Sequence, residues 1–144
     1  MSLKPAQAWL PLHLPKIPGK RMIYPQSEHA MNNRKPDDDT ARATRLFVER
    51  LRVNYPVQAA LLFGSRARHT HRPDSDADVA VLLRGVAAPF LKTKLAMADV
   101  AFDILLETGI RIQPLPVWLS EWENPERYSN PTLLANIAHD GVPL

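Results

Sequence analysis

The chain of 144 residues is 45% hydrophobic and 23% charged, with a net charge of +3 and a pI near 9.4, and this length suits one domain with a substantial core rather than two. It contains no cysteine, which excludes disulfides and thiolate sites. No stretch reaches the ~20 apolar residues of a membrane helix, and prolines interrupt the N-terminal apolar residues that a signal peptide would need, so we expect a cytoplasmic protein that binds no membrane.

Residues 1–36 form a proline-rich, basic N-terminal extension. They hold six of the 14 prolines, and six basic residues against one acidic residue. Proline at this density prevents regular hydrogen bonding and favours extended chain, so we expect a flexible segment. Residues 37–144 carry 12 basic and 14 acidic residues. We therefore expect a near-neutral domain at 37–144, without the broad cationic face that binding of a nucleic-acid duplex requires.

A helix is expected at the start of this domain. Three aspartates at 37–39 precede Thr40, and carboxylates at this position cap free N–H groups and complement the helix dipole. The helix should run to about Asn54, because Tyr55 precedes a proline and the residue before proline avoids helical geometry.

Two strands are expected to flank a loop. Val57–Phe63 is a short apolar run between a proline and a glycine, which predicts a buried strand. The second strand is expected at Asp76–Leu83, where alternation places Asp76 and Asp78 on one face of the sheet.

A long helix and a third strand are expected next. Pro89 suits the first turn of a helix that runs to Thr108. Apolar residues recur along this helix at spacings of four and three, which predicts an amphipathic stripe, the face that such a helix turns to the core: Leu91, Leu95, Ala98, Phe102 and Leu105. The third strand is expected at Ile110–Trp118, whose two prolines remove N–H donors from at least one side.

The C-terminal part is expected to contain a loop or short turn at Leu119–Asn130 and a helix at Pro131–His139 with Asn130 as its cap. The order helix, strand, loop, strand, helix, strand, helix predicts an α/β layer with a small sheet.

The loop between the first two strands carries the candidate chemistry. It begins at Gly64 and Ser65 and, after ten intervening residues, reaches Asp76 and Asp78. Two carboxylates ~6–7 Å apart at the backbone repel each other unless a cation lies between them, and Mg²⁺ prefers a few carboxylates together with phosphate oxygens and water. Glycine lets the backbone approach an anion, and the serine hydroxyl can donate to phosphate. Two further loop residues are suited to hold a triphosphate tail: Arg66 and Arg68.

The segment GSRARHTHRPDSDADVAVLL resembles the G-S-x₁₀-D-x-D signature of the polymerase-β nucleotidyltransferase superfamily. The chain is similar in size to the minimal nucleotidyltransferase (MNT) domains, and most similar to the MNT antitoxins that pair with HEPN-type RNase toxins. The resemblance covers roughly residues 38–144. It implies an α/β fold with a small mixed sheet of three to four strands packed with helices. It also implies an enzyme that, with Mg²⁺, transfers AMP from ATP onto a tyrosine of the HEPN toxin and so neutralises it.

Carried over residue by residue, the resemblance assigns the nucleotide phosphates to Gly64 and Ser65, and Mg²⁺ ligation and catalysis to Asp76 and Asp78. Active members of the superfamily add a third carboxylate on the following strand, and its expected place falls near Gln113. A neutral amide cannot act as a base. This departure counts against two-metal catalysis more than against nucleotide binding.

Three other interpretations stay open. A non-catalytic antitoxin of the same fold would bind its toxin stoichiometrically, with Gln113 marking a degraded site. A nucleotidyltransferase acting on a small molecule or an RNA end is another, although the near-neutral domain counts against RNA. A zinc site at His69 and His71 lacks an obvious third ligand, which makes it the weaker alternative.

Overall fold

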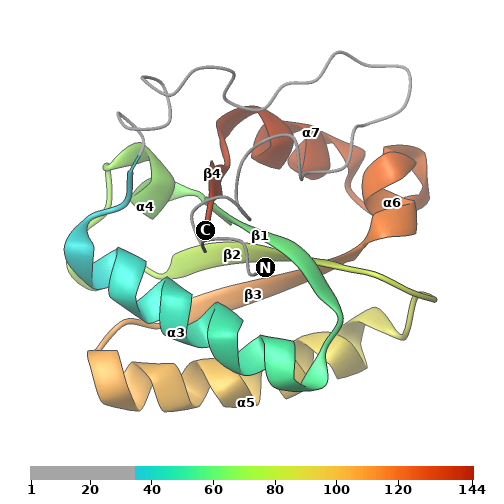
Figure 1. Cartoon of the computed structure of the whole chain (residues 1–144). Helices are drawn as coiled ribbons and strands as arrows, with labels where there is room; N and C mark the ends of the chain where they lie inside the picture. Colours follow the sequence, from blue (N-terminus) through green and yellow to red (C-terminus); the bar gives the residue numbers. More distant parts are fainter. Residues whose placement is uncertain (1–34) are drawn as a thin grey trace, which may run out of the picture.

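The computed structural model describes residues 35–144, so the flexibility expected of the N-terminal extension concerns residues that lie almost wholly outside the described part. Within the described part, four strands form one mixed sheet with helices on both faces (Figure 1). The strand order is β3-β2-β1-β4, and the strands are β1 (Val57–Phe63), β2 (Ala77–Leu83), β3 (Ile112–Trp118) and β4 (Val142–Pro143). The predicted α/β fold class is confirmed.

The connections between the strands explain their directions. The loop after β1 returns the chain antiparallel as β2, with Phe63 opposite Asp78. The helix α5 (Phe90–Thr108) then crosses over the sheet, so that β3 runs parallel to β2, as such crossovers require. The C-terminal strand β4 pairs antiparallel with the other side of β1.

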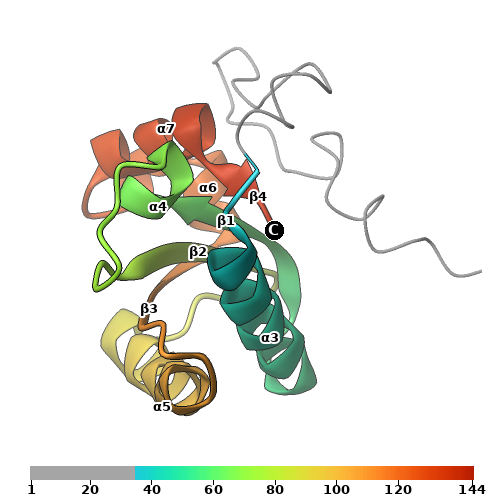
Figure 2. The same ribbon diagram turned by 90° about the vertical axis from the view of Figure 1, so that its left-hand side faces the viewer.

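Both faces of the sheet are covered (Figure 2). Because side chains alternate along a strand, β2 sends Val79 and Val81 into one apolar cluster and Ala80 and Leu82 into another. The first cluster includes residues of α3 (Asp38–Asn54) and α5, and the second includes residues of the C-terminal helices. This double burial explains why the strand sequence is apolar at nearly every position after Asp78.

The helix ends follow the predicted caps. The Asp37 side chain accepts hydrogen bonds from the backbone N–H of Thr40 (2.9 Å) and from its hydroxyl (2.8 Å), and α3 ends at Asn54. The helix α7 (Pro131–Asp140) is capped by Asn130, whose side chain accepts from the Leu133 N–H at 3.1 Å. Both sequence signals are confirmed.

The predicted core-facing stripe of α5 is wrong. Four other residues of the helix are buried: Thr93, Met97, Ala101 and Ile104. The predicted stripe is largely exposed, since Leu91, Leu95 and Phe102 retain 65%, 59% and 53% of their accessible surface. The helix is apolar on two sides, and the side with smaller residues packs on the sheet and α3. Periodicity identifies both sides but does not choose between them.

The strand β3 lies at one edge of the described sheet. The Arg111 carbonyl accepts from the Ala77 N–H at 2.8 Å, so odd-numbered residues here point their backbone groups toward β2. The backbone nitrogens of Pro114 and Pro116 therefore point to the open edge, although both residues are buried. Their lack of N–H donors leaves this edge unsuited to pairing with a further strand.

Several short elements escaped prediction. They are the single turn α4 (Ser65–Arg68) and the two-residue β4, together with α6 (Leu119–Glu123) and the 3₁₀ turn η2 (Pro125–Arg127) in the segment expected as loop or short turn. Residues 35–144 contain no helix with the length and apolar composition to cross a membrane.

Candidate functional site

The two halves of the G-S…D-x-D motif meet where β1 ends and β2 begins. Phe63 lies opposite Asp78 in the strand register, so Gly64 comes beside the Asp78 side chain. Gly64 has a φ of 75°, and a Cβ built on it would collide with Asp78 Oδ2. Both the left-handed backbone and the close approach require glycine here.

Ser65 lies directly after this glycine, at the first turn of α4. The turn is closed by the Ala67 and Arg68 N–H groups, which donate to the Gly64 carbonyl at 3.1 and 3.2 Å. Within residues 35–144 the half-buried Ser65 hydroxyl makes no hydrogen bond. It is thus a donor available to an anion beside the carboxylates.

The surroundings of the Asp78 carboxyl disfavour its charged form. Burial raises the pKa of its carboxyl above the usual value of 3.8, and the neighbouring Asp76 charge raises it further. Arg68 and Lys94 oppose this shift without cancelling it. A cation held by the two aspartates would relieve both causes of the shift.

Lys94 is the site residue that the sequence did not reveal. It comes from α5, far from the motif in sequence, yet it is one of the two cations that act on Asp78. Its ammonium also lies 5.9 Å from the centroid of the Phe90 ring. Lys94 lies near the motif because of the way α5 crosses the sheet. No local sequence pattern predicts this position.

The structure aligns Gln113 with the motif aspartates. Gln113 is opposite Asp78 in the parallel β2–β3 register, and its side-chain Nε2 donates to Asp76 Oδ2 at 3.2 Å. Gln113, the residue near which the third carboxylate is expected, therefore lies beside both motif aspartates. Among residues 35–144, no group of three His, Cys, Asp or Glu side chains is arranged to hold a metal ion.

Arg66 has a role different from the phosphate contact suggested by the sequence. Its side chain is only 3% exposed. Its Nε donates to the Ser75 carbonyl (2.9 Å), one Nη to Thr40 Oγ1 (2.9 Å) and the other to the Pro73 carbonyl (3.1 Å). The guanidinium thus fastens the loop before β2 to the start of α3, whereas Arg68 is exposed beside the aspartates.

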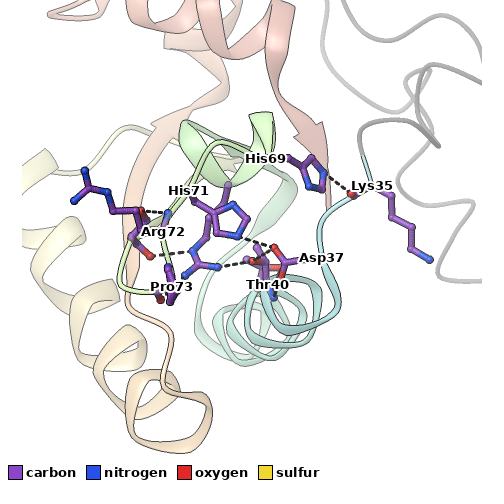
Figure 3. A network of polar contacts seen from close by, with 10 residues as sticks. Lys35, Asp37, Thr40, His69, His71, Arg72 and Pro73 are labelled. Atoms are coloured by element: carbon purple, nitrogen blue, oxygen red, sulfur yellow. Dashed lines mark hydrogen bonds and ion pairs between the residues drawn. The ribbon is translucent and has the colours of Figure 1, made fainter.

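The two loop histidines belong to the same polar network (Figure 3). His71 Nε2 lies 3.2 Å from Asp37 Oδ2, and His69 Nε2 lies 2.8 Å from the Lys35 carbonyl oxygen. Their ring centroids are 6.5 Å apart. Each is held by a different neighbour, so the structure gives the zinc alternative no support.

Comparison with known proteins places this geometry in context. The model of the family "Polymerase beta, Nucleotidyltransferase" matches residues 48–113, a range that includes the glycine, the serine and both aspartates of the motif. No curated protein sequence matches the chain. The crystal structure of a protein assigned as a nucleotidyltransferase from Sulfolobus solfataricus is similar at 18% identity and a TM-score of 0.45, covering 74% of this chain and 82% of that one.

Proposed function

Since residues 48–113 belong to the polymerase-β nucleotidyltransferase family, we propose that this chain transfers AMP from ATP, with Mg²⁺, onto a tyrosine of a HEPN-type RNase toxin. The transfer would neutralise the toxin and make the chain its antitoxin. The family membership supports nucleotidyl transfer. The antitoxin role rests on the small size of the domain and the sequence resemblance described above.

One observation carries the proposal: the packing of Gly64 directly against the Asp78 carboxylate. This contact brings the turn at Gly64 and Ser65, to which we assign phosphate binding, beside the pair of carboxylates. Ser65 offers its hydroxyl, while Arg68 and Lys94 supply positive charge near Asp78. Such a site suits a polyphosphate together with a cation.

The donor set fits one Mg²⁺ ion. Two carboxylates plus phosphate oxygens and water are the usual ligands of this ion. Burial, and after it the neighbouring Asp76 charge, raises the pKa of Asp78, and a bound cation would favour the charged form of this carboxyl. Asp76 and Asp78 would hold the ion, which when bound neutralises charge on the phosphates.

The proposed reaction is a displacement at the α-phosphorus of ATP. The tyrosine oxygen forms a bond to phosphorus, the bond to the oxygen that bridges to the β-phosphate breaks, and pyrophosphate leaves. Arg68 and Lys94 would stabilise the charge on the departing pyrophosphate. The phenol proton needs an acceptor that Gln113 cannot provide, so we assign this role to a group brought by the toxin.

A second candidate function follows from Gln113. Its hydrogen bond to Asp76 puts a neutral amide beside the aspartates, where the resemblance leads us to expect a carboxylate. A chain of this kind could bind nucleotide, or the toxin alone, without transfer. This candidate predicts a tight complex that is indifferent to Mg²⁺ and ATP.

The test is incubation of the full chain with the cognate toxin, Mg²⁺ and ATP labelled at the α-phosphate. Label on a toxin tyrosine, and its loss in an Asp76→Asn/Asp78→Asn double variant, would support transfer. Absence of label together with neutralisation by that double variant would refute transfer and support the binding function.

Replacement of Gln113 sharpens the choice. Gln113→Asp introduces a carboxylate opposite Asp78. We expect transfer to be at least ~10-fold faster, which is below the ~10²–10⁴-fold that a well-positioned general base contributes. Gln113→Asn, the matched control with a shortened amide, should bring no gain. An equal rate in both variants would show that the missing base is not what limits the reaction.

A further inference from the structure

Gln113 lies on β3 with its side chain on the same face of the sheet as the motif aspartates. Ile112 belongs to the apolar cluster that includes residues of α3 and α5, and so does Val79 on β2. Because side chains alternate along a strand, Gln113 and Asp78 both point to the opposite face. Ile112 and Pro114 are buried, so the exposed glutamine side chain starts from a fixed main chain.

The amide of Gln113 is the one donor to the Asp76 carboxylate among residues 35–144. Its Nε2 donates to Asp76 Oδ2 at 3.2 Å, and no other hydrogen bond or ion pair within this part of the chain reaches the carboxylate. A carboxylate offers about four lone-pair sites to donors and cations. The amide uses one of them, so the remaining sites can still bind a cation.

The main chain on both sides of Asp76 is held by hydrogen bonds. Arg66 Nε donates to the Ser75 carbonyl at 2.9 Å, and the Ala77 N–H donates to the carbonyl that precedes β3 at 2.8 Å. These bonds fix where the Asp76 side chain begins, but the carboxylate can still rotate about its own side-chain bonds. The hydrogen bond from Gln113 is the described contact that limits this rotation.

An amide and a carboxylate at this position have different electrostatic effects. A carboxylate would add a third negative charge beside Asp76 and Asp78, which already repel each other. The N–H of an amide is attracted to the same carboxylates and adds no charge. With Gln113 in place, the charge of the two aspartates equals that of one divalent cation in magnitude.

We propose that Gln113 is a positioning residue for this cation: through its hydrogen bond it holds Asp76 in the orientation that binds the ion together with Asp78. Hydrogen-bond partners of ligating groups typically contribute about 10–100-fold to metal affinity. The inference rests on the cation site of the proposed function but does not depend on transfer to a toxin. It gives the amide a role that needs no general base.

The first test measures the binding of Mn²⁺ to the full chain without nucleotide, by electron paramagnetic resonance of the free ion. Mn²⁺ prefers the same oxygen ligands as Mg²⁺. Gln113→Leu removes the donor and should raise the Kd at least ~10-fold. Gln113→Asn keeps an amide but is one methylene shorter, so it no longer reaches Asp76 and should also raise the Kd.

The matched control is Gln58→Leu on β1. Gln58 lies at the end of this strand opposite Phe63, and its Oε1 accepts from Arg84 Nη1 at 3.4 Å. The same substitution there removes an amide far from the aspartates and should leave the Kd unchanged. A wild-type Kd in Gln113→Leu would overturn the proposal. Absence of Mn²⁺ binding by the wild-type chain at millimolar concentrations would overturn the proposed cation site as well.

Urea unfolding separates positioning from a general role in folding. Because Gln113 is exposed, both Gln113 variants should keep the wild-type urea midpoint. If Gln113→Leu lowers the midpoint, Gln113→Asn decides the question: a wild-type midpoint together with a wild-type Kd in that variant would overturn the proposal.

The last test follows the amide itself by ¹H–¹⁵N nuclear magnetic resonance. The side-chain NH₂ signals of Gln113 are those missing from the spectrum of Gln113→Leu. They should shift when Mg²⁺ is added to the wild-type chain, because the ion binds the carboxylate to which the amide donates. The NH₂ signals of Gln58 should stay in place. Unchanged Gln113 signals, while the backbone signals of Asp76 and Asp78 shift, would overturn the proposal and leave the cation site standing.

Discussion

Arg66→Ala should destabilise the domain strongly. Arg66 is buried and makes three hydrogen bonds, to two loop carbonyls and to the buried hydroxyl of Thr40. Hydrogen bonds from a charged group contribute ~1.5–3 kcal/mol each. The two carbonyls belong to a loop that can turn to water once the arginine is gone. We therefore expect a net loss of about 3–4 kcal/mol, out of a typical ~5–15 kcal/mol for a domain.

The assay is urea-induced unfolding, monitored by circular dichroism. With a slope of ~1.5–2 kcal/mol per M, the midpoint should fall by about 2 M. Arg68→Ala is the matched control two residues away: its side chain is exposed, so its free energy of unfolding should change by less than ~0.5 kcal/mol. The affinity of the Arg68→Ala variant for ATP should fall instead. Arg68 supplies positive charge near Asp78, and we propose that this charge stabilises the phosphates.

Arg66→Lys separates geometry from charge. Lysine keeps the positive charge but cannot reach three oxygens in different directions, so most of the destabilisation should remain. An Arg66→Ala protein of wild-type stability that binds ATP poorly would refute the reasoning, since it would place Arg66 among the phosphate ligands.

Two further predictions concern pH. The pKa of Asp78 is raised in the folded state, so the folded protein binds a proton at this carboxyl more tightly than the unfolded chain does. The contribution of Asp78 to the free energy of unfolding therefore declines as pH rises from 3.8 through the pKa of the folded state. Asp78→Asn should therefore raise the melting temperature at pH 7 but not at pH 3, and should abolish any stabilisation by Mg²⁺; equal melting temperatures at pH 7 would contradict this. Burial acts to raise the pKa of Asp37, but hydrogen bonds from Thr40 and the charges of His71 and Arg66 outweigh it and leave the pKa lowered. The stabilisation by Asp37 is present above pH 3.8 and is lost as pH falls through the pKa of the folded state. Asp37→Ala should therefore lower the free energy of unfolding by ~1–2 kcal/mol at pH 7 and by less at acid pH, as measured by urea unfolding at each pH.

The sequence predicted the features that depend on local chemistry. The bounds of β1 were predicted to the residue, and the Asp37 and Asn130 caps were predicted because short polar side chains satisfy free N–H groups at helix starts. The family resemblance also indicated a position near Gln113 for a residue beside the aspartates, and the parallel register does place Gln113 opposite Asp78.

Features that depend on three-dimensional packing were missed. The burial of α5 was assigned to the wrong side because both sides carry apolar residues at helical spacing. Lys94 reaches the site only through the crossover of that helix. Arg66 and Arg68 look equivalent in the sequence, and only the folded loop makes one a buried tie and the other an exposed cation.

The contact between Gly64 and Asp78 also restricts how this chain can change over generations. While Asp78 is present, a side chain at Gly64 has to displace its carboxylate and to adopt a positive φ that L residues rarely take, so substitutions there are disfavoured whether or not the protein is catalytic. Gln113, by contrast, is exposed and can vary without a clash. Related chains can therefore change more readily at the β3 position than at the paired glycine and aspartate. An intact glycine–aspartate pair in a homologue therefore says less about activity than the identity of the residue at the position of Gln113 on β3.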